Sequence, residues 1–210
     1  SEGKITKAKK YYQYCINKGC NDARIYLNYG AILTDNPKLA EILISKAIEI
    51  NPNYTLAYFN LGKIQKEQGK LKEAEESMKK VITIDKNFMQ GYSNLGNIMH
   101  ELGNLKQAEI YLKEALKLKP DSANNNCNLG TILLKAGKVK EAEVTTRRAI
   151  KINSNFAVAF SNLGNIMREL GNNKEAEINL RKAIEINPNL EAAYSNLGNT
   201  LKDIGNLEEA

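Results

Sequence analysis

The sequence has no tryptophan, one histidine, three cysteines and four prolines among its 210 residues. Because His100 is the only imidazole, a catalytic base or metal cluster would lack a second histidine, and we expect His100 on the surface. The cysteines are odd in number and are not spaced as metal-ligand pairs, which disfavours a disulfide framework and a zinc site. These shortages predict no catalytic constellation, no metal and no cofactor within the chain, so that any catalytic domain is expected outside it.

Long apolar runs are also absent. No segment approaches the roughly 18 apolar residues that a membrane-spanning helix needs, and the lysine near the first residue leads into no apolar signal-peptide core. With 42% hydrophobic and 26% charged residues the composition is ordinary for a soluble protein, and the formal charge of +6 is mild. We therefore predict a cytoplasmic protein with no membrane partner and, since the first residue is Ser rather than Met, a piece of a longer one.

The sequence does contain a repeat with a period of 34 residues. The dipeptide Leu-Gly, a second glycine and an alanine each return at this interval, which indicates stacked units of the same structure. The Leu-Gly glycines are Gly62, Gly96, Gly130, Gly164 and Gly198, the second glycines are Gly69, Gly103, Gly137, Gly171 and Gly205, and the alanines are Ala40, Ala74, Ala108, Ala142, Ala176 and Ala210.

Each unit should fold as two helices. In the unit 54–87 the apolar residues Tyr58, Leu61 and Ile64 recur at spacings of three and four, the pattern of an amphipathic helix, and a second such stripe follows Gly69. Glycine lets the chain leave a helix through a left-handed conformation. The small Leu-Gly glycine and the repeated alanine permit two helices to approach closely. A tight helical hairpin is therefore predicted for every repeat.

Applied to the whole chain, the pattern predicts one domain over residues 1–210. Proline should end the second helices, because it disfavours helix in the residue before it. The boundaries then fall at Pro52, Pro120 and Pro188; complete repeats are expected at 22–53, 54–87, 88–121, 122–155 and 156–189, the second helix of a truncated repeat at 3–18, and the first helix of another at 190–210.

These residues resemble the tetratricopeptide repeat, a helix-turn-helix unit of about 34 residues with an aromatic, Leu-Gly, Ala and Pro at set offsets. The resemblance implies an all-α fold, a right-handed α-solenoid of stacked antiparallel helix pairs whose first helices line a concave face. Asn126 replaces the aromatic residue, so we expect a soft start to its repeat. Lys86 and Ser154 replace the boundary proline, and Thr146 replaces a large apolar residue, so these junctions should be less firmly specified.

An asparagine precedes every Leu-Gly, and helix propensity does not explain it, because asparagine is a poor interior helix former. Its amide carries a donor and an acceptor, which match the two groups of a peptide unit. The row resembles the asparagine ladder in the repeat domain of O-linked N-acetylglucosamine transferases. The resemblance implies peptide-binding residues Asn28, Asn60, Asn94, Asn128, Asn162 and Asn196. Asn97, Asn165 and Asn199, the small polar residues three positions later on the same helices, are further peptide-binding candidates. Alternatively, the amides hydrogen-bond adjacent first helices to each other; the two roles are compatible.

Second helices carry a row of basic residues, which raises nucleic acid as a partner. A glutamate stands four residues before each of them, the favourable orientation for a surface ion pair, and no base-stacking aromatics are interleaved. We therefore predict four ion pairs and no nucleic-acid binding. The basic residues are Lys79, Lys113, Arg147 and Arg181, and the glutamates are Glu75, Glu109, Glu143 and Glu177.

The predicted function is a protein–protein interaction scaffold that binds extended peptide segments in a concave, asparagine-lined groove. It would be the substrate- or partner-recruiting part of a larger glycosyltransferase-like or sulfotransferase-like protein. The alternative is a self-associating structural array, in which unpaired helix faces at Ile5, Ala8 and Leu201 stack end to end. Cys127 on the first-helix face could be a reactive thiol, and Cys15 aligns with a small core site, but we expect both cysteines mainly to fill space.

Overall fold

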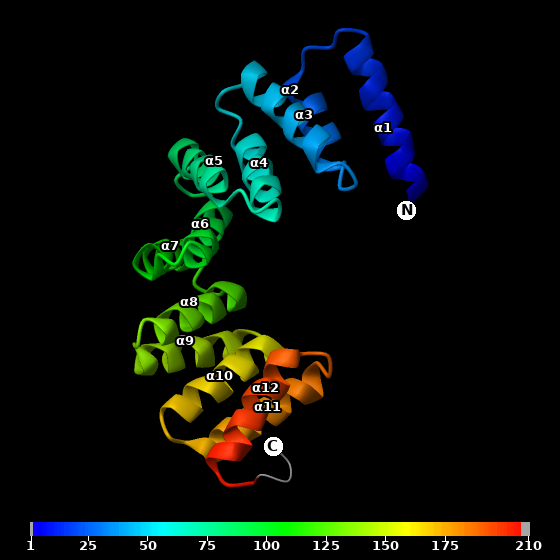
Figure 1. Cartoon of the computed structure of the whole chain (residues 1–210). Coiled ribbons are helices and arrows are strands. Elements are labelled where there is room, and N and C mark those ends of the chain that lie inside the picture. The colour runs from blue at the N-terminus through cyan, green and yellow to red at the C-terminus, as the bar shows by residue number, and fades with distance from the viewer. Residues whose placement is uncertain (1, 207–210) are drawn as a thin grey trace. The chain divides into compact units, whose positions relative to one another are not determined.

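The computed structural model describes residues 2–206, with side chains from residue 3. These residues form α-helices and no strand, which confirms the all-α prediction (Figure 1). The described chain divides into two compact units between Leu102 and Gly103, called unit 1 and unit 2 below. The end of the predicted segment 190–210, including Ala210, lies outside the described residues, and the repeat boundaries and the single domain stay predictions.

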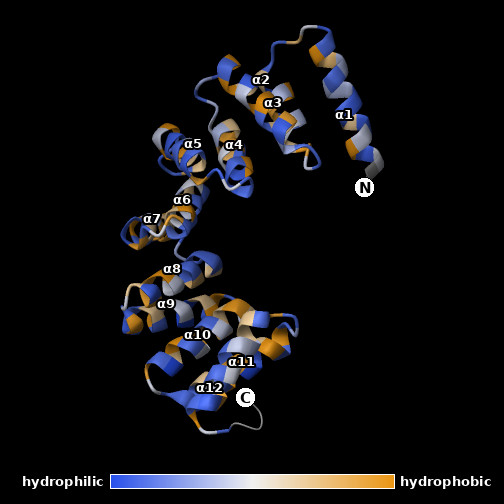
Figure 2. Ribbon diagram, in the orientation of Figure 1, coloured by the Kyte–Doolittle hydropathy of each residue, from blue (hydrophilic) through white to orange (hydrophobic). Residues whose placement is uncertain are grey.

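Within each unit the helices follow one another as stacked neighbours, and Figure 2 shows that they carry both hydrophilic and hydrophobic residues. Unit 1 holds α1 (Glu2–Asn17), α2 (Ala23–Ala31), α3 (Pro37–Ile50), α4 (Thr55–Glu67), α5 (Leu71–Ile84) and α6 (Met89–Glu101). Unit 2 holds α7 (Leu105–Leu118), α8 (Ala123–Lys135), α9 (Val139–Ile152), α10 (Ala157–Glu169), α11 (Asn173–Ile186) and α12 (Glu191–Asp203).

Most hairpin turns contain a glycine in a left-handed conformation, as predicted, but the turn between α2 and α3 contains no residue with a positive φ. Gly69, between α4 and α5, has φ +75°, and Gly171, between α10 and α11, has the same value. In this left-handed region any other residue would bring its Cβ against the backbone. Glycine at this position therefore fixes where α4 and α10 end and where the following helix begins.

The end of each second helix depends less on proline than the sequence suggests. The side chain of Asp85 accepts a hydrogen bond from the Asn87 N–H at 2.9 Å, and Asn153 accepts one from the Asn155 N–H at 3.0 Å. Such an Asx turn offers the backbone an alternative to another helical turn. The junctions that lack proline are thus specified by an Asp or Asn, contrary to the expectation that they would be loose.

The soft start expected at Asn126 is also absent. Ser122 caps α8 by accepting from the Asn125 N–H at 3.3 Å. The Asn126 amide, only 1% exposed, donates to the carbonyls of Pro120 at 3.1 Å and Ser122 at 2.9 Å. Because these bonds satisfy two carbonyls at the N-terminus of α8, Asn126 stabilises the start of its repeat, where the other repeats have an aromatic residue.

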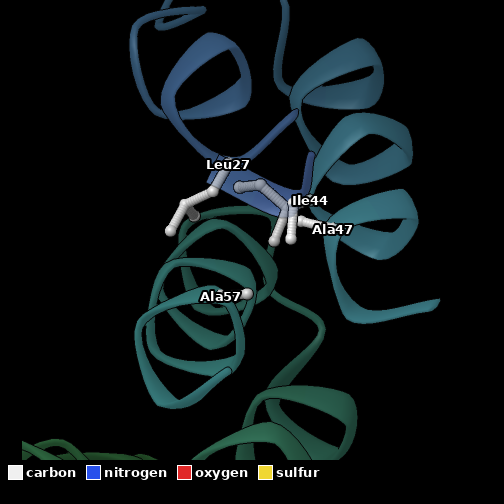
Figure 3. Close-up of a cluster of buried hydrophobic side chains, with 5 residues drawn as sticks. Leu27, Ile44, Ala47 and Ala57 are labelled. Atoms are coloured by element: carbon white, nitrogen blue, oxygen red, sulfur yellow. The ribbon is translucent and has the colours of Figure 1, made fainter. Parts of the chain in front are cut away.

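Small residues bring the helices of a hairpin together, as predicted. In unit 1, Leu27 and Ile44 pack with Ala47 and Ala57 in one buried cluster (Figure 3). In unit 2, a Cβ added at Gly164 would lie 2.5 Å from Leu180 Cγ, closer than real side chains approach. The spacing of α10 and α11 therefore requires a residue without a side chain in the Leu-Gly dipeptide.

Candidate functional site

In unit 1 the ladder asparagines turn their amides toward their own helices. Asn60 Nδ2 donates to the Leu56 carbonyl at 2.8 Å, and Asn94 Nδ2 donates to the Gln90 carbonyl, also at 2.8 Å. Asn28 is exposed. A carboxamide has two N–H donors and one carbonyl oxygen. Asn60 and Asn94 therefore each retain one N–H and the Oδ1 acceptor.

A small hollow of about 140 Å³ adjoins Asn60 between the end of α2 and α4. Ala31 and Thr34 line one side of it, and Asn60, Lys63 and Glu67 line the other. Lys63 and Glu67 are exposed and form no ion pair with any described residue. The hollow thus offers an amide, a cation and a carboxylate within one cavity on the first-helix face of unit 1.

In unit 2 two ladder amides cross to the preceding repeat instead. Asn162 Nδ2 donates to Thr131 Oγ1 at 3.0 Å and contacts Cys127 Sγ at 3.3 Å. Asn196 Nδ2 donates to Ser161 Oγ at 3.4 Å. These bonds join α8 to α10 and α10 to α12, as the structural alternative predicts. The donors of Asn162 are both engaged within the protein, and peptide binding by this residue stays a prediction.

The preceding repeat decides between the two arrangements. Asn162 reaches the residues that stand one before and three after Asn128, namely Cys127 and Thr131, and both have atoms that accept a hydrogen bond. For Asn94 the equivalent residues are Phe59 and Lys63, which have no side-chain acceptor. For Asn60 they are Leu27 and Ala31, which are apolar. Without an acceptor across the repeat, the amide bonds its own helix.

The remaining predicted positions differ in exposure. Asn128 and Asn97 are half-buried, and Asn199 is exposed. Asn165 Oδ1 accepts a hydrogen bond from Arg168 Nη2 at 3.5 Å. The structure therefore brings some of the nine asparagines into bonds between repeats and leaves others with polar atoms on the surface.

Cys127 is a buried packing residue, as we expect, rather than a reactive thiol. It is 1% exposed, and burial raises its pKa to about 11. Because the thiolate is the nucleophile, a raised pKa and a buried sulfur both oppose reaction. The side chain acts as packing and as the partner of the Asn162 amide.

The basic row on the second helices is neutralised as predicted. Each glutamate bonds the basic residue four positions later, at 2.7 Å for Glu75–Lys79, 2.6 Å for Glu109–Lys113, 2.8 Å for Glu143–Arg147 and 3.0 Å for Glu177–Arg181. Hydrogen bonds that Lys113 and Lys138 donate to the Glu109 carboxylate lower the pKa of Glu109. Within residues 2–206 no group of three or more His, Cys, Asp or Glu residues is placed to hold a metal ion. None of the described helices is long and apolar enough to cross a bilayer.

Comparison with known proteins agrees with this helix arrangement. Residues 43–76, 90–122 and 123–156 match tetratricopeptide repeat families, and residues 164–205 match a further TPR repeat family. The fold is therefore a tetratricopeptide-repeat solenoid. The tetratricopeptide repeats support a general function for this chain as a scaffold for protein–protein interaction.

Solved structures share the fold. YrrB, described as a TPR protein with an unusual peptide-binding site, is 24% identical with a TM-score of 0.72, and the match covers 87% of this chain and 95% of YrrB. MamA is 26% identical with a TM-score of 0.64 over 71% of this chain and 87% of MamA. PilW, described as a widely conserved type IV pilus biogenesis factor, is 20% identical with a TM-score of 0.80 over 90% of this chain and 88% of PilW. No curated protein matches the sequence significantly.

Proposed function

We propose that the chain binds extended peptide segments on its first-helix face and that the ladder asparagines hold the peptide backbone. The observation that carries this proposal is the set of polar atoms left on Asn60 and Asn94, one N–H and one Oδ1 each. A peptide unit presents one carbonyl and one N–H, so one amide side chain can bond both. Such recognition is independent of the peptide's side chains.

Unit 1 is the principal site in this proposal. The hollow beside Asn60 exists where unit 2 has a hydrogen bond between repeats, because Ala31 stands at the position of Thr131. A ligand side chain that enters the hollow meets Lys63 and Glu67, which have no ion-pair partner among the described residues. In unit 2 the Oδ1 atoms of Asn162 and Asn196 continue the row of asparagines as acceptors. Both N–H groups of Asn162 are already engaged, and one N–H group of Asn196 is bonded to Ser161.

Unit 2 also contributes Asn128 and the second row, Asn165 and Asn199, while Asn97 belongs to unit 1. We further propose that the chain recruits a substrate or partner for a larger cytoplasmic protein, glycosyltransferase-like or sulfotransferase-like. This part of the proposal is supported by the ladder residues and not by the general fold.

The test is selection of binders from a displayed library of unstructured ten-residue peptides, followed by titration of a selected peptide. We expect the combined change Asn28→Ala, Asn60→Ala and Asn94→Ala to weaken binding at least about tenfold, because each hydrogen bond contributes about 1 kcal/mol. Asn87→Ala is the matched control, since this exposed asparagine lies in the loop before α6. Equal affinity of the triple variant and the control variant would reject the ladder as the binding element.

Self-association is a second candidate, and one observation favours it. A hollow of about 610 Å³ lies beside α12, lined by Tyr194, Leu197 and Leu201 together with residues of α11. Tyr194 is 49% exposed there, and at the other end of the chain Ile5 is 47% exposed. Sedimentation over a hundredfold concentration range tests the candidate, and a single monomeric species throughout would exclude it.

A further inference from the structure

The outer helices of unit 2 carry a row of exposed aliphatic residues at one repeat position. Ile110 on α7 is 43% exposed, Val144 on α9 is 69% exposed and Ile178 on α11 is 68% exposed; we call them the outer aliphatic row. Single exposed apolar residues are ordinary on a protein surface, but here they recur at the same position of three successive second helices. β-branched residues are also poorer helix formers than alanine by about half a kcal/mol. Neither the core nor helix propensity therefore explains the row.

A row of free lysines runs beside it. Lys106, Lys140 and Lys174 stand four residues before the three aliphatic residues, so each pair occupies the same helix face one turn apart. All three lysines are exposed, and none forms an ion pair with a described residue. The basic residues on the other side of the row are bonded to glutamates. The positive charge that remains available next to the aliphatic row is therefore that of the three lysines.

A cavity connects the two rows at the middle repeat. It has a volume of about 360 Å³, and Val144, Lys140, Glu141, Thr145 and Lys113 line it together with Leu129 and Leu133 of α8. Leu129 and Leu133 are 3% and 1% exposed, so the cavity is an apolar depression whose edge carries the ammonium groups of Lys140 and Lys113 and the carboxylate of Glu141. A partner with an apolar side chain next to a carboxylate would fill the apolar cavity and pair with the Lys140 ammonium group.

The partner's secondary structure follows from what this face lacks. Helices satisfy their own backbone groups, so the face offers no backbone donors or acceptors to an extended chain, whose peptide groups would lose water without replacement. A helical partner satisfies these groups internally. Apolar residues that recur on one face of such a helix would contact the outer aliphatic row in more than one repeat.

We infer that the outer face of α7, α9 and α11 docks an acidic amphipathic helix of a partner protein, with its apolar residues on Ile110, Val144 and Ile178 and its carboxylates on Lys106, Lys140 and Lys174. This surface is separate from the first-helix face of the proposed peptide site. Unit 1 has no equivalent, because the row there consists of Ile42, which is 65% exposed, followed by Glu76 in the next second helix.

The experiment uses the full chain and a fluorescent 21-residue helical peptide with leucines seven residues apart and glutamates beside them. Saturable binding is expected, and Val144→Glu should weaken it at least about tenfold. Ile42→Glu is the matched control, since Ile42 is exposed to the same degree at the same repeat position, and it should leave the affinity unchanged. Helix content measured by circular dichroism shows that both variants fold.

A second peptide separates recognition of charge from non-specific hydrophobic binding. With lysines in place of its glutamates it should bind at least about tenfold more weakly, and Lys140→Glu should reduce this difference. The inference is overturned if binding does not saturate, or if Val144→Glu and Ile42→Glu have equal effects. It is also overturned if the chain binds phosphatidylserine vesicles but not the peptide, or if sedimentation shows a dimer that Val144→Glu dissociates, because the row would then serve a membrane or a second copy.

Discussion

Asn94 in unit 1 and Asn162 in unit 2 occupy the same position of their repeats, and their amides lie in different places. Asn94 donates to the carbonyl four residues earlier in its own helix, whereas Asn162 donates to Thr131 in the preceding repeat. The sequence around the two asparagines is nearly the same, Ser-Asn-Leu-Gly-Asn-Ile-Met in both cases. The difference comes from the repeat before: Lys63 in one unit and Thr131 in the other.

This comparison shows that a repeated residue does not have one fixed role. In a stacked repeat protein each unit contacts only its neighbours, so the neighbour supplies half of every contact between repeats. An asparagine that meets a hydroxyl joins the repeats, and one that meets an apolar or cationic side chain keeps polar atoms for another molecule. Asn162 and Asn196 in unit 2 therefore join repeats, whereas Asn60 and Asn94 in unit 1 keep more polar atoms for a ligand.

The largest expected effect compares the Leu-Gly glycines of the two units. Gly164→Ala places a Cβ 2.5 Å from Leu180 Cγ and 3.1 Å from the Ala176 carbonyl oxygen. Gly62→Ala meets the flexible Met78 Cε at 2.9 Å and has looser contacts with Ser77 Cβ at 3.2 Å and the Ala74 carbonyl oxygen at 3.3 Å. We expect Gly164→Ala to lower the free energy of unfolding by about 1–3 kcal/mol through overpacking. Gly62→Ala should be close to neutral, because alanine gains about 1 kcal/mol of helix propensity.

Urea unfolding followed by circular dichroism measures both variants. Equal losses of stability would mean that the two hairpins are packed alike, and the contrast between Met78 and Leu180 would have no consequence.

The next effect concerns the ladder itself. Asn162→Ala removes a hydrogen bond to Thr131 and a contact with Cys127, so we expect a loss of about 1–2 kcal/mol in the free energy of unfolding. Asn94→Ala removes one bond within a helix and introduces a better helix former, so its stability should change by less than about 0.5 kcal/mol. Comparable losses in urea unfolding would show that both amides are structural, which would also weaken the peptide-binding proposal.

The smallest effect tests the cause of the difference. Lys63→Thr gives the repeat before Asn94 the hydroxyl that Thr131 gives the repeat before Asn162. In a double-mutant cycle, Asn94→Ala should then cost about 0.5–1 kcal/mol more in the Lys63→Thr background than in the unchanged chain. Thr131→Val in unit 2 should produce the opposite coupling with Asn162→Ala. A cycle that closes to zero in unit 1 would show that the neighbouring hydroxyl does not direct the amide.

Much of the fold could be predicted, because it depends on residues that repeat. Gly69 and Gly171 mark the hairpin turns, and the spacing of Glu143 and Arg147 predicts the ion pair that the structure contains. Proline does not predict the helix ends at Asp85 and Asn153, because the side chains of these residues form Asx turns there. The repeat pattern does not predict the Asn126 junction either, because Asn126 replaces the packing of an aromatic residue with hydrogen bonds to two carbonyls.

The sequence predicts where the candidate site lies but not which hydrogen bonds its asparagines form. By itself the sequence determined the helix pairs, the turns and the alignment of the asparagines, because these follow from periodicity and from local backbone preferences. Only the tertiary structure decided which acceptor each amide reaches, that Cys127 is buried and that Val144, Leu129 and Lys140 line one cavity. The physical reason is that these features join residues on different helices, and the outcome depends on whether the facing side chain offers a hydrogen-bond acceptor or leaves space at the point of contact.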